Sequence, residues 1–538
     1  MRFIFSTRCR VPAATSRFAT AFSLLALIVI GVACDQFESH APQKYFSETR
    51  VPVQDEFRWS NGSAIKTIDP ALAFNSPESD VVRAIYEGLT DLNPETLDAI
   101  PSIAESWTQS VDGRVWIFTL RDDARWSNGD VVTAHDFVRS WKRLATEGLP
   151  VSLSPLVTNI NGLSGSKSRQ NDSSRGDEPS GDVTTAIDDF ILQVVLAEPD
   201  SDLPKVLSHQ IFRPVHSSFD AQSNGPDSPL PVTNGAFRIE SVSNNEILLG
   251  RSSLFWDADQ VGVARVRFVM SQSAEQALDD YRAGRLDAVT NFDFEPLALK
   301  LLSSYSDFRR SNHSAVNLYE FNVERAPFSD ERVREAFSLA LARERLVQSE
   351  TSGAMGPATS LTPFTENFGK VAEDVARAKV LMAEAGFPEG KDFPQVTLVV
   401  NRNDLQARVA RFAARAWKAA LGVEVRIETR EMGDIEAVRR SGEFDMIRRG
   451  VVFPTPSIKA AQDLIFDDAN PAEKLAESRA VSVASSGESV EEKEEIPFAV
   501  IALYFPKSYS LVKPSVRGFS VNSFGASPVK KVTLSKSG

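Results

Sequence analysis

The most constraining feature of the sequence is a strand, a long helix and a second strand within residues 395–428. Residues 395–400 (QVTLVV) are apolar and β-branched, as expected for a buried strand. Residues 404–421 have the length of a helix, and Gly422 stands where a helix commonly ends. Residues 423–428 follow as a second strand. A helix of this length between two strands predicts a right-handed crossover and a parallel pair, so this part should be an α/β domain.

Two further helices are predicted before this unit. In residues 330–348, apolar side chains recur at helical spacing. Residues 373–385 form a second helical segment, which is stopped by Gly386 and then Pro388. Strands and helices therefore mix along this part of the chain, as in an α/β fold.

Residues 120–144 hold two tryptophans, a histidine and several carboxylates, which raises the question of a catalytic site. The local pattern favours a structural role for these residues instead. A strand (VWIFTL) leads to a turn at residues 127–130, and Thr133 with Asp136 forms a capping box that begins a helix. No second ligand or base lies at a useful spacing from His135, so we interpret this histidine as structural.

The chain has 538 residues, too many for one compact core, so two or three domains are expected. Its net charge of −13 argues against nucleic-acid binding, which needs a basic face. Residues 164–182 and 480–495 are rich in serine, glycine and charge and are predicted to be surface loops.

The N-terminus resembles an export signal. Four arginines precede an apolar run at residues 19–33, and Gly31 and Ala33 are the small residues that a signal peptidase accepts. We therefore predict a signal peptide at residues 1–33 and a tether at residues 34–53. The sequence GVAC also resembles a bacterial lipobox, which makes Cys34 the candidate lipidation site, although leucine is usual at the position of Gly31. Ordinary cleavage without lipidation and a retained anchor helix are the alternatives.

Catalytic and metal-binding chemistry are not indicated. The only cysteines are Cys9 and Cys34, so the mature chain has no internal disulfide. The five histidines show no metal-ligand spacing, and no nucleophile elbow or phosphate-binding loop is present. We expect neither an enzyme nor a protein with a cofactor or a metal.

A series of short motifs, in order from about Phe57 to Phe519, resembles the periplasmic oligopeptide- and dipeptide-binding proteins of ABC importers. The quoted stretches are IDP (68–70), YEGL (86–89), AESW (104–107), FTLRDDARWSNGDVVTAHDFVRSW, TNGAF (233–237), FWD (255–257), AGRLD (283–287), FN (321–322), APF (326–328), RVREAFSLALARE, AEAGFP, WKAALGVEV, GEFDM and LVKPSVRGF.

The resemblance implies an α/β fold of the periplasmic-binding-protein type, with two main lobes joined by a hinge and an extra domain. Lobe I would comprise residues 54–86, 214–317 and 506–538, domain II residues 87–213, and lobe III residues 318–505. The implied function is to capture a peptide in the cleft between the lobes and deliver it to a membrane permease, as a periplasmic or lipid-anchored monomer. The alternatives are a non-peptide cargo (oligosaccharide, metal chelate or haem) and a sensor or scaffold that has lost its ligand.

The resemblance also implies a ligand site between lobes I and III. The expected residues are Phe74 and Asn75 on one side, Arg448, Gly450 and Val451 on the other, and Glu320, Asn322 and Arg439 nearby. Arg439 and Arg448 match arginines that face a peptide's carboxylate end, although both could instead be surface arginines beside a strand.

The sequence departs from the family after Gly450. Peptide binders usually continue with a tryptophan and an Asp-Tyr run, whose aspartate holds the ligand's α-ammonium group. Here the chain reads VVFPTPS, and no carboxylate occurs before Asp463. Either another acid such as Glu320 substitutes, or the ligand is not a free-amine peptide. The segment 451–495 is also shorter than in relatives, and their usual helix pair is not recognisable in it.

Overall fold

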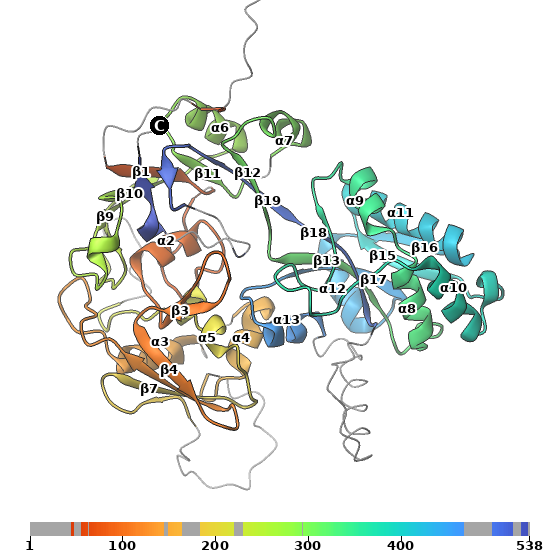
Figure 1. Ribbon diagram of the computed structural model, residues 1–538, viewed down its shortest axis with the longest axis horizontal. Coiled ribbons are helices and arrows are strands. Elements are labelled where there is room, and N and C mark those ends of the chain that lie inside the picture. Colours follow the sequence, from red (N-terminus) through yellow and green to blue (C-terminus); the bar gives the residue numbers. More distant parts are fainter. Residues whose placement is uncertain are drawn as a thin grey trace, which may run out of the picture.

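The computed structural model of the protein describes residues 45–47, 55–62, 64–144, 149–163, 183–219, 230–292, 294–466, 498–519, 524 and 529–535 (Figure 1). The predicted signal peptide, Cys34 and the two predicted surface loops lie outside these residues. Within them, no helix is long and apolar enough to cross a membrane.

Seven strands form the first large sheet, in the order β12-β19-β11-β1-β10-β9-β8. Strand β1 pairs in parallel with β10 and β11, and the remaining pairs are antiparallel. Its strands and helices are β1 (Glu56–Ser60), α2 (Glu78–Ile85), β8 (Phe237–Val242), β9 (Glu246–Arg251), β10 (Arg265–Val269), α6 (Ala274–Arg282), β11 (Ala288–Thr290), α7 (Pro296–Leu302), β12 (Phe308–Asn312) and β19 (Lys507–Val512).

Six strands form the second large sheet, in the order β14-β18-β13-β17-β15-β16. The elements of this lobe are β13 (Ala315–Phe321), α8 (Glu331–Leu339), α9 (Arg343–Glu350), β14 (Gly356–Pro357), α10 (Val375–Glu384), β15 (Val396–Asn401), α11 (Asp404–Leu421), β16 (Val425–Arg430), α12 (Met432–Ser441), β17 (Met446–Val452), α13 (Ile458–Ile465) and β18 (Val500–Phe505).

The predicted strand-helix-strand unit is confirmed in this second sheet. Strands β15 and β16 pair in parallel, and α11 joins them. Gly422 ends the helix at a φ of 74°, a left-handed conformation that favours glycine.

The predicted single helix over residues 330–348 is wrong, because the structure has two helices with a break at residues 340–342. The buried guanidinium of Arg343 lies at the end of α8 and donates to the carbonyls of Ser338 (3.1 Å) and Leu341 (3.2 Å). Its Nε also donates to the carbonyl of Ala502 in β18, at 2.6 Å. The apolar periodicity continues across the break, so the sequence pattern does not reveal this contact.

A smaller domain contains a four-stranded antiparallel sheet in the order β4-β5-β7-β6 and a separate pair of strands, β2 and β3. Its elements are β2 (Thr90–Leu92), β3 (Ala99–Pro101), β4 (Ala104–Gln109), β5 (Val115–Leu120), α3 (Ala134–Leu144), α4 (Ser154–Thr158), β6 (Thr185–Ala186), β7 (Ile191–Val195) and α5 (Leu203–Val206). One half of the predicted capping box is present, since the Thr133 backbone N–H donates to the Asp136 carboxylate at 2.9 Å. The Thr133 hydroxyl donates to the same carboxylate at 3.2 Å and does not accept from the Asp136 N–H, so the reciprocal half is not formed. Both tryptophans of this stretch, Trp126 and Trp141, are buried.

Short elements complete the described fold. They are the strands β20 (Val516–Arg517) and β21 (Thr533–Leu534) and 3-10 helices at Val151–Leu153, Gln210–Phe212, Ala258–Gln260, Pro388–Gly390 and Val529–Lys531.

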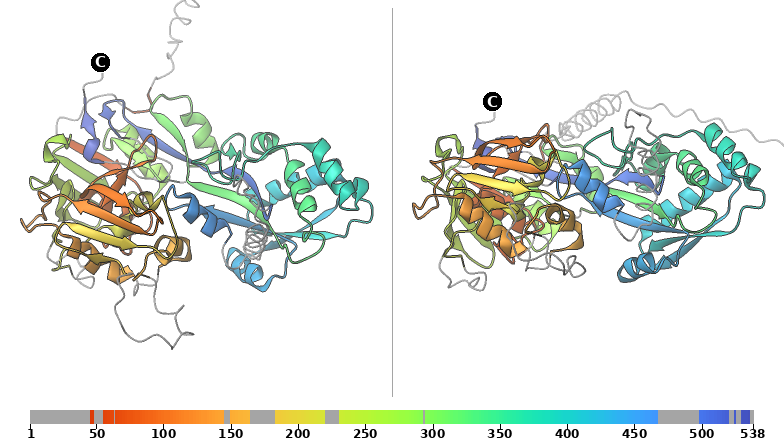
Figure 2. Two further views of the ribbon diagram at one scale, coloured as in Figure 1. Left: turned by 60° about the horizontal axis from the view of Figure 1, so that its bottom comes forward. Right: turned by 90° about the horizontal axis from the view of Figure 1, so that it is seen from below.

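The molecule therefore has two large α/β lobes and an extra domain, which we call lobe I (first large sheet), lobe III (second large sheet) and domain II (four-stranded sheet). Lobe I and domain II share one continuous hydrophobic core, whereas lobe III has its own. The views agree that lobe III stands apart on one side, while domain II lies against lobe I (Figures 1 and 2).

Part of the expected tether is docked on lobe I. The backbone N–H groups of Phe46 and Ser47 donate to the Asp307 carboxylate at 2.9 and 3.2 Å. The Phe46 ring also packs against Tyr281 and Tyr305. The described residues 45–47 of the expected tether are therefore packed against lobe I.

Candidate functional site

The connection between lobes I and III is a pair of adjacent chain segments. Strand β12 continues through His313 and Ser314 into β13, and β18 continues through Pro506 into β19. The His313 backbone N–H donates to the Pro506 carbonyl at 2.9 Å, which ties the two segments together. Burial lowers the pKa of His313, which favours a neutral imidazole here. Two short segments side by side can act as a hinge.

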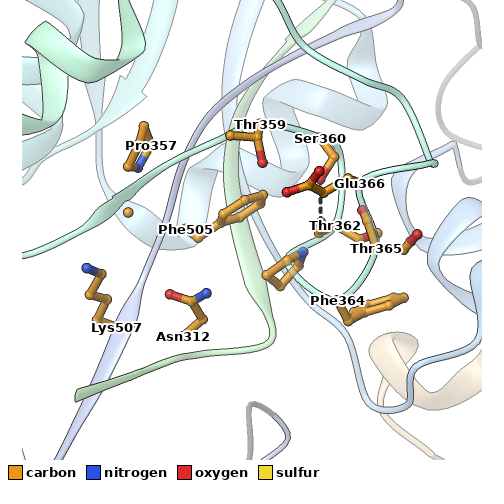
Figure 3. A pocket seen from close by; sticks show the side chains of 12 residues that line it. Asn312, Pro357, Thr359, Ser360, Thr362, Phe364, Thr365, Glu366, Phe505 and Lys507 are labelled. Carbon is orange, nitrogen blue, oxygen red and sulfur yellow. Dashed lines mark hydrogen bonds between the residues drawn. The ribbon is translucent and has the colours of Figure 1, made fainter. Parts of the chain in front are cut away.

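A pocket of about 410 Å³ opens beside this hinge (Figure 3). Asn312 and Lys507 line it from lobe I, and Phe505 and the loop at residues 356–366 line it from lobe III. The loop contributes the hydroxyls of Thr359, Ser360, Thr362 and Thr365. The walls thus come from both sides of the hinge and are largely polar.

Strand β17 approaches the hinge with one edge open. Its pairing with β15 covers only Met446 and Ile447, whereas its pairing with β13 continues to Val452. Among the described residues, no strand pairs with the other edge of β17 from Arg448 onward. An open edge presents backbone N–H and carbonyl groups to which an extended peptide can add as a further strand.

Arg448 lies on this open part of β17. Its Nε donates to Asn317 Oδ1 at 3.1 Å, and its Nη2 donates to the same oxygen. Burial lowers its pKa, and no acidic side chain of the described residues forms an ion pair with it. A Cβ at Gly450 would lie 3.0 Å from Arg448 Nη2, so a glycine leaves room for the guanidinium. Arg448 is thus a partly buried cation that has no acidic partner in the part of the chain that the structure describes.

Polar groups that the sequence analysis did not identify lie around Arg448. Tyr319 pairs with Arg448 across the sheet, and Tyr504 accepts a hydrogen bond from Gln406 Nε2 at 3.0 Å. The Tyr319 hydroxyl and Gln406 Oε1 are buried and have no partner among the described residues. A buried polar atom without a partner costs about 1–3 kcal/mol, so these atoms favour a water or a ligand atom at this point. The sequence of β13 (AVNLYEF) does not single out Asn317 or Tyr319, because every residue of this strand is buried and neither face is wholly polar or apolar.

Glu320 and Arg439 do not face open space, contrary to the expectation from the resemblance. Glu320 is 1% exposed, and Arg439 Nε donates to its Oε2 at 2.9 Å. Arg449 Nη1 donates to the same oxygen at 2.8 Å. Each of the two expected ligand groups is therefore neutralised within lobe III. Because Glu320 is paired with two guanidiniums, it does not offer a free carboxylate to an amine.

Asn322 also has a structural role. Its Nδ2 donates to the carbonyls of Gly442 (3.0 Å) and Phe444 (3.2 Å), and its Oδ1 accepts from the Glu324 N–H at 3.1 Å. Its side chain thus holds the loop between α12 and β17. The Val451 side chain is buried in the core of lobe III, which leaves its backbone for a ligand.

The segment expected on the opposite side of the cleft belongs to lobe I. Phe74 is partly buried, and Gln210 Nε2 holds its carbonyl at 3.2 Å. Asn75 is exposed. Among the described residues, no hydrogen bond or ion pair joins these two residues to Arg448–Val451 across the lobes.

Two lobes on a two-segment hinge, with a free strand edge beside it, define a binding protein that closes around its ligand. Residues 98–472 match the family described as bacterial extracellular solute-binding proteins, family 5 Middle. The chain belongs to this family, as its motifs predicted.

Individual relatives agree with this assignment. The periplasmic oligopeptide-binding protein OppA of Salmonella typhimurium is 34% identical over 407 residues, 73% of each chain. The unliganded open form of the murein tripeptide binding protein MppA aligns with a TM-score of 0.74 at 25% identity, over 90% of this chain and 98% of that one. Haemophilus influenzae OppA in complex with the peptide RPPGFSPFR aligns with a TM-score of 0.60 at 24% identity, over 90% and 100% of the chains.

Proposed function

We propose that this protein is the extracytoplasmic peptide-capturing subunit of an ABC importer. The open edge of β17 from Arg448 to Val452 is the observation that carries the proposal. A strand edge bonds any extended peptide through its backbone and so provides affinity without regard to side chains. The polar pocket beside the hinge has room for water, and bridging water molecules can accommodate different side chains of the ligand.

The proposed ligand lies between the lobes, with Phe74 and Asn75 on one side and the end of β17 on the other. Its carboxylate end pairs with Arg448, because a guanidinium offers paired donors that match two carboxylate oxygens. Arg439, which the sequence pattern placed beside Arg448 in this role, is assigned instead to the buried pair with Glu320.

No acidic side chain among the described site residues is assigned to the amine end of the ligand. The segment from Val451 to Ser457 carries no carboxylate, and Glu320 is occupied by two arginines. We therefore expect a ligand whose N-terminus is blocked or is held by its backbone alone.

The proposed boundaries are residues 54–86, 214–317 and 506–538 for lobe I, 87–213 for domain II, and 318–505 for lobe III. This division is supported by the three larger sheets, each of which takes its strands from one of these sets of residues. The one exception is β13 of lobe III, which begins at Ala315, inside the range given for lobe I. For the N-terminus we propose cleavage after Ala33 and lipidation of Cys34, which intact-mass measurement of the exported chain would test. The proposed setting is periplasmic, with the chain acting as a monomer that delivers peptide to a membrane permease.

The test is calorimetry with one peptide in free, C-terminally amidated and N-terminally acetylated forms. Replacing Arg448 with Ala should weaken binding of the free peptide by about 1.5–3 kcal/mol, the range for a hydrogen bond to a charged group. The amidated peptide should lose far less, and acetylation should matter little in either protein. Arg440→Ala is the matched control, because Arg440 is an exposed arginine of the same lobe and its ion pair with Glu436 lies within one helix. Equal losses for the free and amidated peptides would show that Arg448 does not hold the carboxylate.

A further inference from the structure

Helix α13 is shared between two parts of the molecule. Its residues Ala461, Leu464 and Ile465 belong to the core of lobe III. Ala460, on another face of the same helix, belongs instead to the core shared by lobe I and domain II. In Figure 1 the helix lies between α4 of domain II and the sheet of lobe III.

The N-terminal end of α13 is bonded to domain II. The Ile458 backbone N–H donates to Asp202 Oδ2 at 3.1 Å, and Lys459 Nζ donates to Glu198 Oε2 at 2.7 Å. The gap between the helix and domain II is only about 10 Å³, barely room for one water, and Leu156, Leu203 and Val206 help to line it. The N-terminal end of α13 therefore packs against domain II and forms an ion pair with it.

The charges around Lys459 are mainly negative. Asp463 lies 3.9 Å from its ammonium group, and Asp200 lies nearby in domain II. Burial, together with the neighbouring acids, raises the pKa values of Asp200 and Asp463, whereas the hydrogen bond from Lys459 lowers that of Glu198. Burial alone would lower the pKa of Lys459, but the acids outweigh it and raise the value.

The other end of α13 is bonded to β17, the strand that is proposed to bind the ligand. Arg449 donates from Nη1 to the Ile465 carbonyl at 2.9 Å and from Nη2 to the Leu464 carbonyl at 2.8 Å. The same guanidinium pairs with Glu320, and Arg449 is the neighbour of Arg448 in β17. Helix α13 must therefore move together with lobe III.

Domain II, in contrast, must move together with lobe I. The two share a core, and the buried ion pairs of Asp69 with Arg143 and of Glu87 with Lys530 connect residues of lobe I to residues of domain II. Any rotation of lobe III about the hinge at His313 and Pro506 thus shifts α13 against domain II. A displacement of a few ångströms would break an ion pair of 2.7 Å.

We propose that α13 is a latch between domain II and lobe III that stabilises the ligand-free open arrangement. The proposal rests on the proposed function, since it concerns the closure that captures the peptide. The alignment with the unliganded open form of MppA supports an open arrangement here. In the proposal the latch contacts are lost on closure, so they oppose closure and lower the apparent affinity for the ligand. Domain II then regulates the site through a contact made outside the ligand cleft.

The test compares Lys459→Glu, Glu198→Lys and the double charge swap. Spin labels on the exposed positions Val111 of domain II and Met432 of lobe III, introduced as Val111→Cys and Met432→Cys with Cys34→Ser, report the distance between these parts. Each single reversal should raise the closed fraction of the ligand-free protein about two- to fivefold. The swap should move the distribution back part of the way, because an acid at position 459 still lies beside Asp463 and Asp200. The control is the reversal of Lys418, whose ion pair with Glu424 at 2.5 Å lies within lobe III.

An unchanged distance distribution in both single variants would overturn the latch. A change that the double swap does not reduce at all would also overturn it, because the effect would then belong to the altered charges and not to the pair. The measurement needs no peptide, so its outcome is independent of whether the proposed ligand binds.

Discussion

Replacing Glu320 with Gln should destabilise lobe III strongly without changing which end of a peptide is recognised. The carboxylate is 1% exposed and lies 2.9 Å from Arg439 Nε and 2.8 Å from Arg449 Nη1. Its removal leaves Arg439, itself 3% exposed, without its buried acidic partner. Breaking a buried ion pair from one side costs about 3–5 kcal/mol, because the remaining charge stays desolvated.

Hydrogen exchange is the suitable assay, since a protein of several lobes need not unfold in one step. The amides of β13 and β17 should lose protection, while those of the lobe I sheet should not. Replacing Glu320 and Arg439 together with Met should recover part of the loss, because the buried charge of Arg439 is removed with its partner, while Arg449 keeps its bonds to the carbonyls of Leu464 and Ile465. If Glu320→Gln leaves protection unchanged but abolishes binding of free-amine peptides, then Glu320 is a ligand group and the reasoning fails.

Two further substitutions test the structure at single residues. Asp80 is buried, and burial raises its pKa from 3.8 to about 6 despite the hydrogen bond from Asn61. The folded state then binds more protons than the unfolded state between these values, so stability falls as pH rises through this range, by about 3 kcal/mol in total. Asp80→Asn should therefore stabilise the protein at pH 7.5 but not near pH 4, and an equal effect at both pH values in urea unfolding would contradict this. Gly422→Ala should cost more than about 1 kcal/mol, because φ is 74° and the new Cβ would lie 2.1 Å from the Glu389 carbonyl, whereas Gly433→Ala in α12, where nothing lies within 4 Å, should be neutral or stabilising in the same assay.

Local patterns predicted the fold well where neighbouring residues determine the structure. The strand-helix-strand unit at residues 395–428 and the capping box at Thr133 both depend on neighbours in the sequence. The break between α8 and α9 depends on Arg343, whose guanidinium reaches the carbonyl of Ala502, 159 residues away. Helix α13 was not predicted, because only eight residues form it and two different cores bury its faces.

For the candidate site, the sequence suggested residues but not which of their charges pair with one another. The family motif identified Arg448 and Gly450, and the structure puts the guanidinium across that glycine. Glu320 and Arg439 were both expected to face a ligand, yet they face each other from positions 119 residues apart. Sequence spacing cannot show which charges neutralise one another, because that depends on how α12 packs on the second sheet.

The strand order of the first sheet has a consequence for how the chain becomes a folded protein. Strand β19, from residues close to the C-terminus, lies between β11 and β12, and the sheet also contains β1 from near the N-terminus. The strands of the second sheet come from one uninterrupted stretch, residues 315–505. As the chain emerges from its N-terminus, lobe III can therefore fold while the first sheet still exposes the unpaired edges of β11 and β12. The first sheet, which contains the first strand of the chain, is therefore completed last. Loss of about the final thirty residues would remove β19 and leave a gap between β11 and β12.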